Sequence, residues 1–152
     1  MAPYILENIP AILNPESIAG HLRVEAGKRY YKVIEEIVGN AQKIARPKGL
    51  YLAAFKIPVG DDLVVIGESS FESRVLKVNL ENIHRVFPFV ATCGKELDQW
   101  SKSFNGPFEG FALNAIKSFV LQSAVNYIDR HIEKNFKTAK LSRMTPGSLK
   151  DW

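Results

Sequence analysis

The longest regular pattern of apolar and polar positions runs from residue 107 to residue 136. Apolar side chains recur there at every third or fourth position, while Lys117, Gln122 and Glu133 fall between them. This spacing places the apolar residues on one side of a helix, predicted from about Pro107 to Phe136. Pro107 suits the first turn because its missing N–H would have no helical partner there. The apolar stripe consists of Phe111, Ala115, Ile116, Phe119, Val120, Ala124 and Ile128.

Helix signals also occur nearer the N-terminus. Asn14 can cap a helix and Pro15 can occupy its first position, so a short helix is expected through Leu22. Apolar residues recur at helical spacing again between Tyr30 and Ile44, and a proline and a glycine soon follow. Two further short helices are expected over residues 71–80 and 94–100.

Two segments have the composition of β-strands, Leu50 to Ile57 and Leu63 to Glu68. The loop between them is short and contains glycine and aspartate, which is typical of a hairpin and implies antiparallel pairing. Asp61 and Asp62 are candidate metal ligands, but no third ligand lies nearby. Aspartate is common in turns, so we interpret both residues as turn formers.

A further apolar run, His84 to Gly94, predicts a buried strand. Pro88 removes one ladder donor, so this strand is expected to lie at an edge or to be irregular at that point. Helices interleaved with a hairpin and one more strand favour an α+β fold over a doubly wound parallel sheet. We expect a mixed, mainly antiparallel sheet packed against several helices, including one long C-terminal helix.

Composition narrows the class of protein. With 152 residues and 46% hydrophobic content, the chain is expected to form a single domain spanning residues 1–152. The net charge of +4 is modest, although most of it falls after Ile128. That excess suits either an anionic partner or a solvated basic helix end. A lone cysteine, no signal peptide and no apolar run of ~20 residues lead us to expect a cytoplasmic protein without a membrane segment.

No set of residues predicts catalysis or a metal site. Cys93 precedes a predicted helix start, where a thiol pKa can be lowered, but no His or Asp is placed beside it. We therefore favour an inert, buried Cys93. The histidines, His21, His84 and His131, lack metal-ligand spacing. The spacing of Tyr127, His131 and Asn135 puts them on one helical face, which suits a pocket and core packing equally.

The last segment breaks the helical pattern before it. Arg143 stands three residues before Pro146-Gly147, and Asp151-Trp152 ends the chain. A guanidinium beside a Pro-Gly turn can bind an anionic ligand. The turn exposes backbone groups, and arginine can form two parallel hydrogen bonds with a carboxylate. The same residues also suit a simple helix stop and chain reversal.

Arg143-x-x-Pro146-Gly147 followed by Asp151-Trp152 resembles the ligand-binding turn in the activation domain of vitamin B12-dependent methionine synthase. It is more similar to the small stand-alone proteins related to that domain. The run Phe89 to Gly94 ahead of a helix and the pattern of Phe71, Ser73, Leu76 and Leu80 are also similar to this family. The resemblance covers the chain from about Pro10 onward and rests mainly on the order of its short motifs.

The resemblance implies an activation domain-like fold and an accessory role in methionine biosynthesis. In that family the domain binds S-adenosylmethionine and presents its methyl group to cobalamin, whose cobalt has been reduced by one electron. Arg143 would hold the ligand's carboxylate, and Pro146, Gly147 and Ser148 would form the adjoining turn. Ser148 stands where the activation domain of methionine synthase has a tyrosine. The family's acidic N-terminal ligand residue has no clear equivalent, and the domain is expected to lack its C-terminal part.

Two functions follow from this resemblance. The first is an S-adenosylmethionine-binding accessory protein for reductive reactivation of a separate corrinoid protein, such as methionine synthase, with a flavodoxin-like protein as the candidate electron donor. The alternative is a non-catalytic module that docks on a corrinoid-dependent methyltransferase. Whether the chain is itself an enzyme stays open. Nucleic acid is a less favoured partner, because few aromatic residues accompany the C-terminal basic residues.

Overall fold

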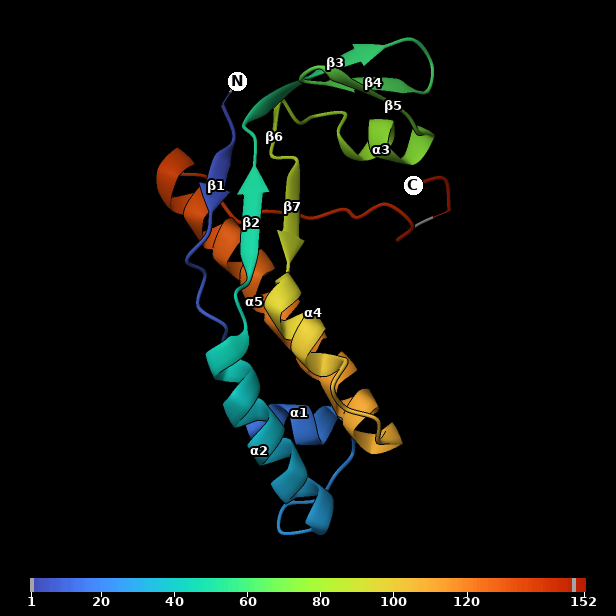
Figure 1. The fold of residues 1–152 in the computed structure, drawn as a ribbon. Helices are drawn as coiled ribbons and strands as arrows, with labels where there is room; N and C mark the ends of the chain where they lie inside the picture. Colours follow the sequence, from blue (N-terminus) through green and yellow to red (C-terminus); the bar gives the residue numbers. More distant parts are fainter. Residues whose placement is uncertain (1, 149) are drawn as a thin grey trace.

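The computed structural model describes residues 2–148 and 150–152, in which five helices and seven strands form an elongated molecule (Figure 1). All strand pairs are antiparallel, so the α+β class with a long C-terminal helix is confirmed. The helices are α1 (Pro15–His21), α2 (Arg29–Ile44), α3 (Arg74–Asn79), α4 (Lys95–Ser101) and α5 (Pro107–Phe136). The strands are β1 (Tyr4–Leu6), β2 (Lys48–Tyr51), β3 (Ala54–Val59), β4 (Leu63–Ile66), β5 (Ser69–Glu72), β6 (Arg85–Val86) and β7 (Phe89–Thr92).

Helix α5 runs through most of the molecule and contributes to both of its hydrophobic cores (Figure 1). Its first half buries Leu113, Ile116 and Val120 against α1, α2 and α4. Its second half buries Ile128 and Ile132 against the sheet of β1, β2 and β7. The predicted apolar stripe is therefore divided between a helical core and a sheet core, except that Phe111 is 63% exposed and lies in neither.

The strands form two sheets, ordered β1-β2-β7 and β5-β4-β3-β6. The register of β2 on β7 continues without a shift into that of β3 on β6. Tyr51 pairs with Phe89, and three residues further along each strand Ala54 pairs with Val86. Between these pairs the Leu52 N–H donates to the Pro88 carbonyl at 3.0 Å. Pro88 has no N–H to donate to the Leu52 carbonyl, so the second hydrogen bond of this pair is missing. The ladder is weaker and bends at this point. The two sheets are thus two halves of one antiparallel ladder.

The two halves of this ladder are covered on opposite faces. In β2, Gly49 and Tyr51 face α5 and are buried, whereas Lys48 and Leu50 are exposed. In β3 the alternation is reversed, with Ala54 buried and its neighbour Phe55 exposed. Helix α3 covers the buried face of the second half, where Val64 and Leu76 lie in the interior. Successive residues of a strand point to opposite faces, so α5 and α3 lie on opposite sides of the ladder.

Most predicted elements are confirmed, and their end signals act as expected. The Asn14 side chain accepts a hydrogen bond from the Ser17 N–H at 3.2 Å, with Pro15 at the first helical position. Gly94 precedes α4 with φ of 90°, and a Cβ there would lie 2.5 Å from the Arg46 carbonyl oxygen. Glycine is therefore required at this strand-to-helix turn.

Two expectations were wrong, and one strand was missed. The segment Leu50 to Ile57 is two strands, because the ladder bends at Leu52 and Ala53. Phe71 lies in β5 and not in a helix, since Ser73 caps the Leu76 N–H and delays the start of α3 to Arg74. Strand β1 was not predicted at all, because three residues are too few to give an alternating pattern. Among the described residues, no helix is both long and apolar enough to cross a membrane.

Candidate functional site

Arg143 lies against the second half of α5. Its Nε atom is 3.4 Å from the Asp129 Oδ2 atom, and the side chains are 39% and 22% exposed. Within residues 2–148 and 150–152, the guanidinium of Arg143 donates no hydrogen bond. Asp129 therefore lies beside the Nε edge of the guanidinium. The N–H groups of the other edge remain available for a carboxylate.

The turn that follows Arg143 is exposed and locally bonded. The Ser148 N–H and hydroxyl both donate to the Thr145 carbonyl, at 3.1 and 2.5 Å. Gly147 adopts φ of 81°, and its N–H donates to the Trp152 carbonyl. Pro146 is exposed beside it. The predicted Pro-Gly turn is thus present three residues after Arg143, and a side chain at Gly147 would strain the backbone.

The end of the chain is fixed to the other half of the molecule. The Val75 N–H donates to the Asp151 Oδ2 atom at 3.2 Å, in the first turn of α3. The Trp152 ring meets the Phe71 ring edge to face, with centroids 5.8 Å apart. The segment after α5, which we call the C-terminal arm (residues 137–148 and 150–152), therefore runs from α5 to the sheet edge at β5 (Figure 1).

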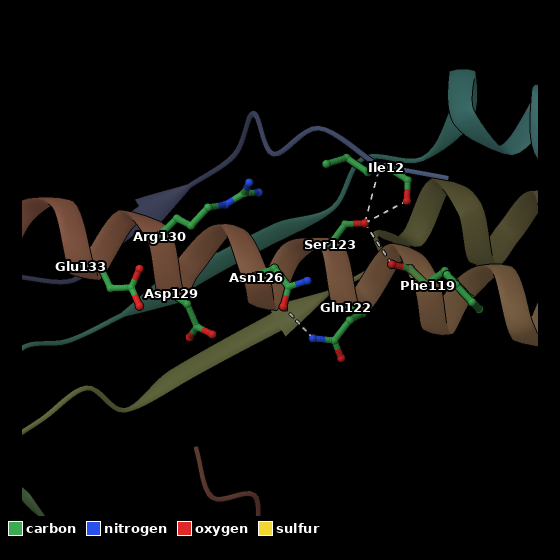
Figure 2. Close-up of a pocket in the computed structure, with 8 residues that line it drawn as sticks. All are labelled: Ile12, Phe119, Gln122, Ser123, Asn126, Asp129, Arg130 and Glu133. Carbon is green, nitrogen blue, oxygen red and sulfur yellow. Dashed lines mark hydrogen bonds between the residues drawn. The ribbon is translucent and has the colours of Figure 1, made fainter. Parts of the chain in front are cut away.

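A groove of about 520 Å³ runs along the polar side of α5 and includes Asp129 (Figure 2). The buried Ser123 hydroxyl accepts a hydrogen bond from the Ile12 N–H at 3.3 Å, which ties the N-terminal segment to one wall. Gln122 and Asn126 bond to each other at 2.8 Å across one helical turn. The groove is lined by Ile12, Phe119, Gln122, Ser123, Asn126, Asp129, Arg130 and Glu133.

The electrostatics of this groove centre on Asp129. Burial raises the pKa of its carboxyl group above the ordinary value, Arg143 opposes that shift, and Glu133 adds to it. The two acidic groups are therefore close enough to disfavour each other's charge. Arg130 and Arg143 supply positive charge on the same stretch of α5 and the arm. The groove thus offers both signs of charge, which suits a ligand that is itself dipolar.

The other residues singled out from the sequence have structural surroundings. Cys93 is half-buried against the helical core, and burial raises the pKa of its thiol. His131 Nδ1 lies 2.9 Å from the buried Tyr51 hydroxyl and 3.0 Å from Asn135 Nδ2. Tyr127 stacks on His131 with ring centroids 6.4 Å apart. This group packs the sheet onto α5, which favours the core interpretation over a pocket.

Sequence reasoning missed Asp129 and the N-terminal wall of the groove. Asp129 follows the buried Ile128 on α5, and only the return of the arm brings Arg143 to it. Ile12 lies 111 positions from Ser123 in the sequence, so no local pattern connects them. The polar stripe of Gln122, Asn126 and Glu133 was a usable signal for a solvated helical face. No family model and no curated protein matches this chain.

Proposed function

We propose that the chain binds S-adenosylmethionine and assists the reductive methylation of a separate corrinoid protein. The observation that supports this proposal most directly is the position of Arg143, held by Asp129 at 3.4 Å and followed by the exposed Pro146-Gly147 turn. A guanidinium whose Nε is fixed by one carboxylate can present its remaining N–H groups to another. The ligand's carboxylate is the expected second partner.

The residues around Arg143 fit the amino-acid end of this ligand. That end carries a carboxylate and an ammonium group, and the adjacent sulfonium is also positive. Arg143 is suited to the carboxylate, whereas Asp129 and Glu133 on the groove wall are suited to the positive groups. The groove volume of about 520 Å³ falls in the range of small-molecule sites.

The role of the chain in this proposal is to bind and orient. When bound, S-adenosylmethionine supplies a methyl group to a corrinoid that the partner protein carries. Arg143 fixes one end of the ligand, and the Pro146-Gly147 turn keeps bulky side chains away from it. No proton transfer is required of the protein.

Isothermal titration calorimetry with S-adenosylmethionine tests the proposal. We expect saturable binding to the native chain and a loss of affinity of about tenfold or more in Arg143→Ala, because a charge-assisted hydrogen bond is removed. Lys140→Ala is the matched control, since it removes one positive charge from the same exposed arm. Arg143→Lys should bind with intermediate affinity, because it keeps the charge and loses the fork.

Two outcomes separate the proposal from its alternative. If the native chain gives no saturable heat but still binds a corrinoid methyltransferase, the chain is a docking module without a ligand. If binding occurs and Arg143→Ala equals Lys140→Ala, the ligand lies elsewhere and Arg143 serves only to attach the arm to Asp129.

A further inference from the structure

The second half of the ladder has one face that carries exposed apolar side chains. Helix α3 lies on the other face (Figure 1), and the contact found with a helix on this face is that of Phe136, the last residue of α5, with Arg85 at one corner. Phe55, Ile57 and Val59 of β3 are 59%, 56% and 42% exposed. A strand normally buries one of its two faces, so this face of β3 lacks a partner within the chain.

The strand register shows which other residues share this face. Residues directly opposite each other on paired strands point the same way. Ile57 pairs with Val65, and Val59 pairs with Leu63, so these side chains extend the apolar surface onto β4. We call the surface formed by Phe55, Ile57, Val59, Leu63 and Val65 the outer face.

Two opposite charges stand at opposite corners of the outer face. Arg85 pairs with Phe55 on the β6 side, and Glu72 pairs with Leu63 on the β5 side. With strand order β5-β4-β3-β6, they are separated by about 14 Å across the strands and about 13 Å along them. The centre of the line between them falls at the pair of Ile57 and Val65.

The described residues leave both corner charges without an ion-pair partner. Arg85 lies over the rings of Phe55 and Phe136, with its guanidinium carbon 5.7 and 5.6 Å from their centroids. In the described part of the chain, neither Arg85 nor Glu72 makes an ion pair. The outer face is therefore apolar at its centre, with one positive and one negative corner equally far from that centre.

We propose that the outer face binds the outer face of a second copy of this chain about a two-fold axis. The two-fold axis lies between the two faces and is parallel to them. It crosses the line from Arg85 to Glu72 at a right angle and at its midpoint, so each Arg85 lies over Glu72 of the partner subunit. The apolar centres then meet each other. The strands of the two copies cross at roughly a right angle, which is one of the two common sheet-on-sheet arrangements.

The charges favour this occupant over a lipid surface. Asp61 and Asp62, with Gly60, form the exposed tip of the β3–β4 hairpin that connects Val59 to Leu63. These two carboxylates outnumber the one ammonium group at the tip, that of Lys77, which donates to the Gly60 and Asp61 carbonyls, so the tip opposes approach to an anionic bilayer. A second copy instead supplies an opposite charge to both Arg85 and Glu72. The five apolar residues of the outer face are few compared with the roughly 20–30 residues that each partner contributes to a standard interface, so the dimer forms at high protein concentration.

Sedimentation velocity of the native chain over a range of concentrations tests the proposal. The sedimentation coefficient should rise from the monomer value toward the dimer value, and Ile57→Asp should abolish that rise. Val90→Asp is the matched control, because Val90 is 63% exposed on the uncovered face of the other sheet. It should associate as the native chain does.

Reversing the charges of Arg85 and Glu72 in separate variants tests whether these two residues pair across the dimer. Arg85→Glu and Glu72→Lys should each lose self-association, because each places like charges at both corners of the dimer. An equal mixture of the two should associate again, since both corners then carry opposite charges. Thermal unfolding of each variant checks that the loss does not come from a misfolded chain.

Three results would overturn the proposal. The first is a native chain that remains monomeric at the highest concentration tested. Binding of this monomeric chain to phosphatidylserine vesicles would then identify a lipid surface as the occupant. The second is an Ile57→Asp variant that associates like Val90→Asp. The third is a mixture of Arg85→Glu and Glu72→Lys that stays as monomeric as either variant alone.

Discussion

At the scale of single residues, Cys93 shows how burial decides reactivity. It lies between β7 and α4, beside a helix start that by itself would favour the thiolate. Burial raises the pKa of the thiol, and the positive charge of Lys117 only partly offsets that shift. The apolar contacts with the helical core therefore outweigh the helix end, and the inert role expected for Cys93 stays the better interpretation.

Cys93 should react slowly with Ellman's reagent. At pH 8 we expect a rate at least tenfold below that of the same chain unfolded in urea, because burial reduces both the thiolate fraction and access. The chain has one cysteine, so the absorbance reports this thiol alone. A native rate equal to the unfolded rate would show that Cys93 is exposed and reactive.

At the scale of elements, the contact between α5 and β2 depends on Gly49. A Cβ at this position would lie 2.6 Å from the Ile128 Cδ1 atom. The strand therefore approaches the helix more closely than any larger residue allows. The sequence offered little sign of this, since Gly49 together with Pro47 indicates a helix stop.

Gly49→Ala should lower the free energy of unfolding by about 1–3 kcal/mol, because the added methyl group forces Ile128 to move. Gly39→Ala is the control, since Gly39 lies in α2 and a methyl group added there would meet no neighbouring atom within 4 Å. It should raise stability by about 0.5–1 kcal/mol through helix propensity. Urea unfolding measures both. Equal effects of the two substitutions would contradict the close approach.

Elements with long periodic patterns were predictable, and short ones were not. Helix α5 was predicted with its observed bounds, because thirty residues repeat its apolar spacing many times. Strands β5 and β6 have four and two residues, which are too few to give an alternating pattern, and β6 also depends on pairing with the distant strand β3. Pro88 was the exception, since its missing N–H predicted the irregularity that separates β6 from β7.

At the scale of the whole molecule, the C-terminal arm connects the two halves. Arg143 attaches it to α5, and Asp151 and Trp152 attach it to α3 and β5. The sequence predicted Arg143 and the Pro146-Gly147 turn as the candidate site. It could not predict Asp129, because the return path of the arm depends on contacts at the far end of the chain.

Trp152→Ala should release the arm. Loss of the aromatic contact with Phe71 is expected to raise the rate of tryptic cleavage after Lys140 by about two- to tenfold. Cleavage after Lys28, in the α1–α2 loop at the other end of the molecule, serves as the internal control. Trp152→Phe should stay close to the native rate. An unchanged rate after Lys140 in Trp152→Ala would show that Trp152 does not hold the arm.

The common register of the ladder has a kinetic consequence. Its paired strands are far apart in the sequence, so their association closes a long loop before most of the apolar surface is buried. The second half of α5 and helix α3 each pack on the ladder, on opposite sides, whereas the helical core of α1, α2, α4 and the first half of α5 packs without it. We therefore expect formation of the ladder to be the slow entropic step for the sheet core and for the packing of α3, and the helical core to form independently of it.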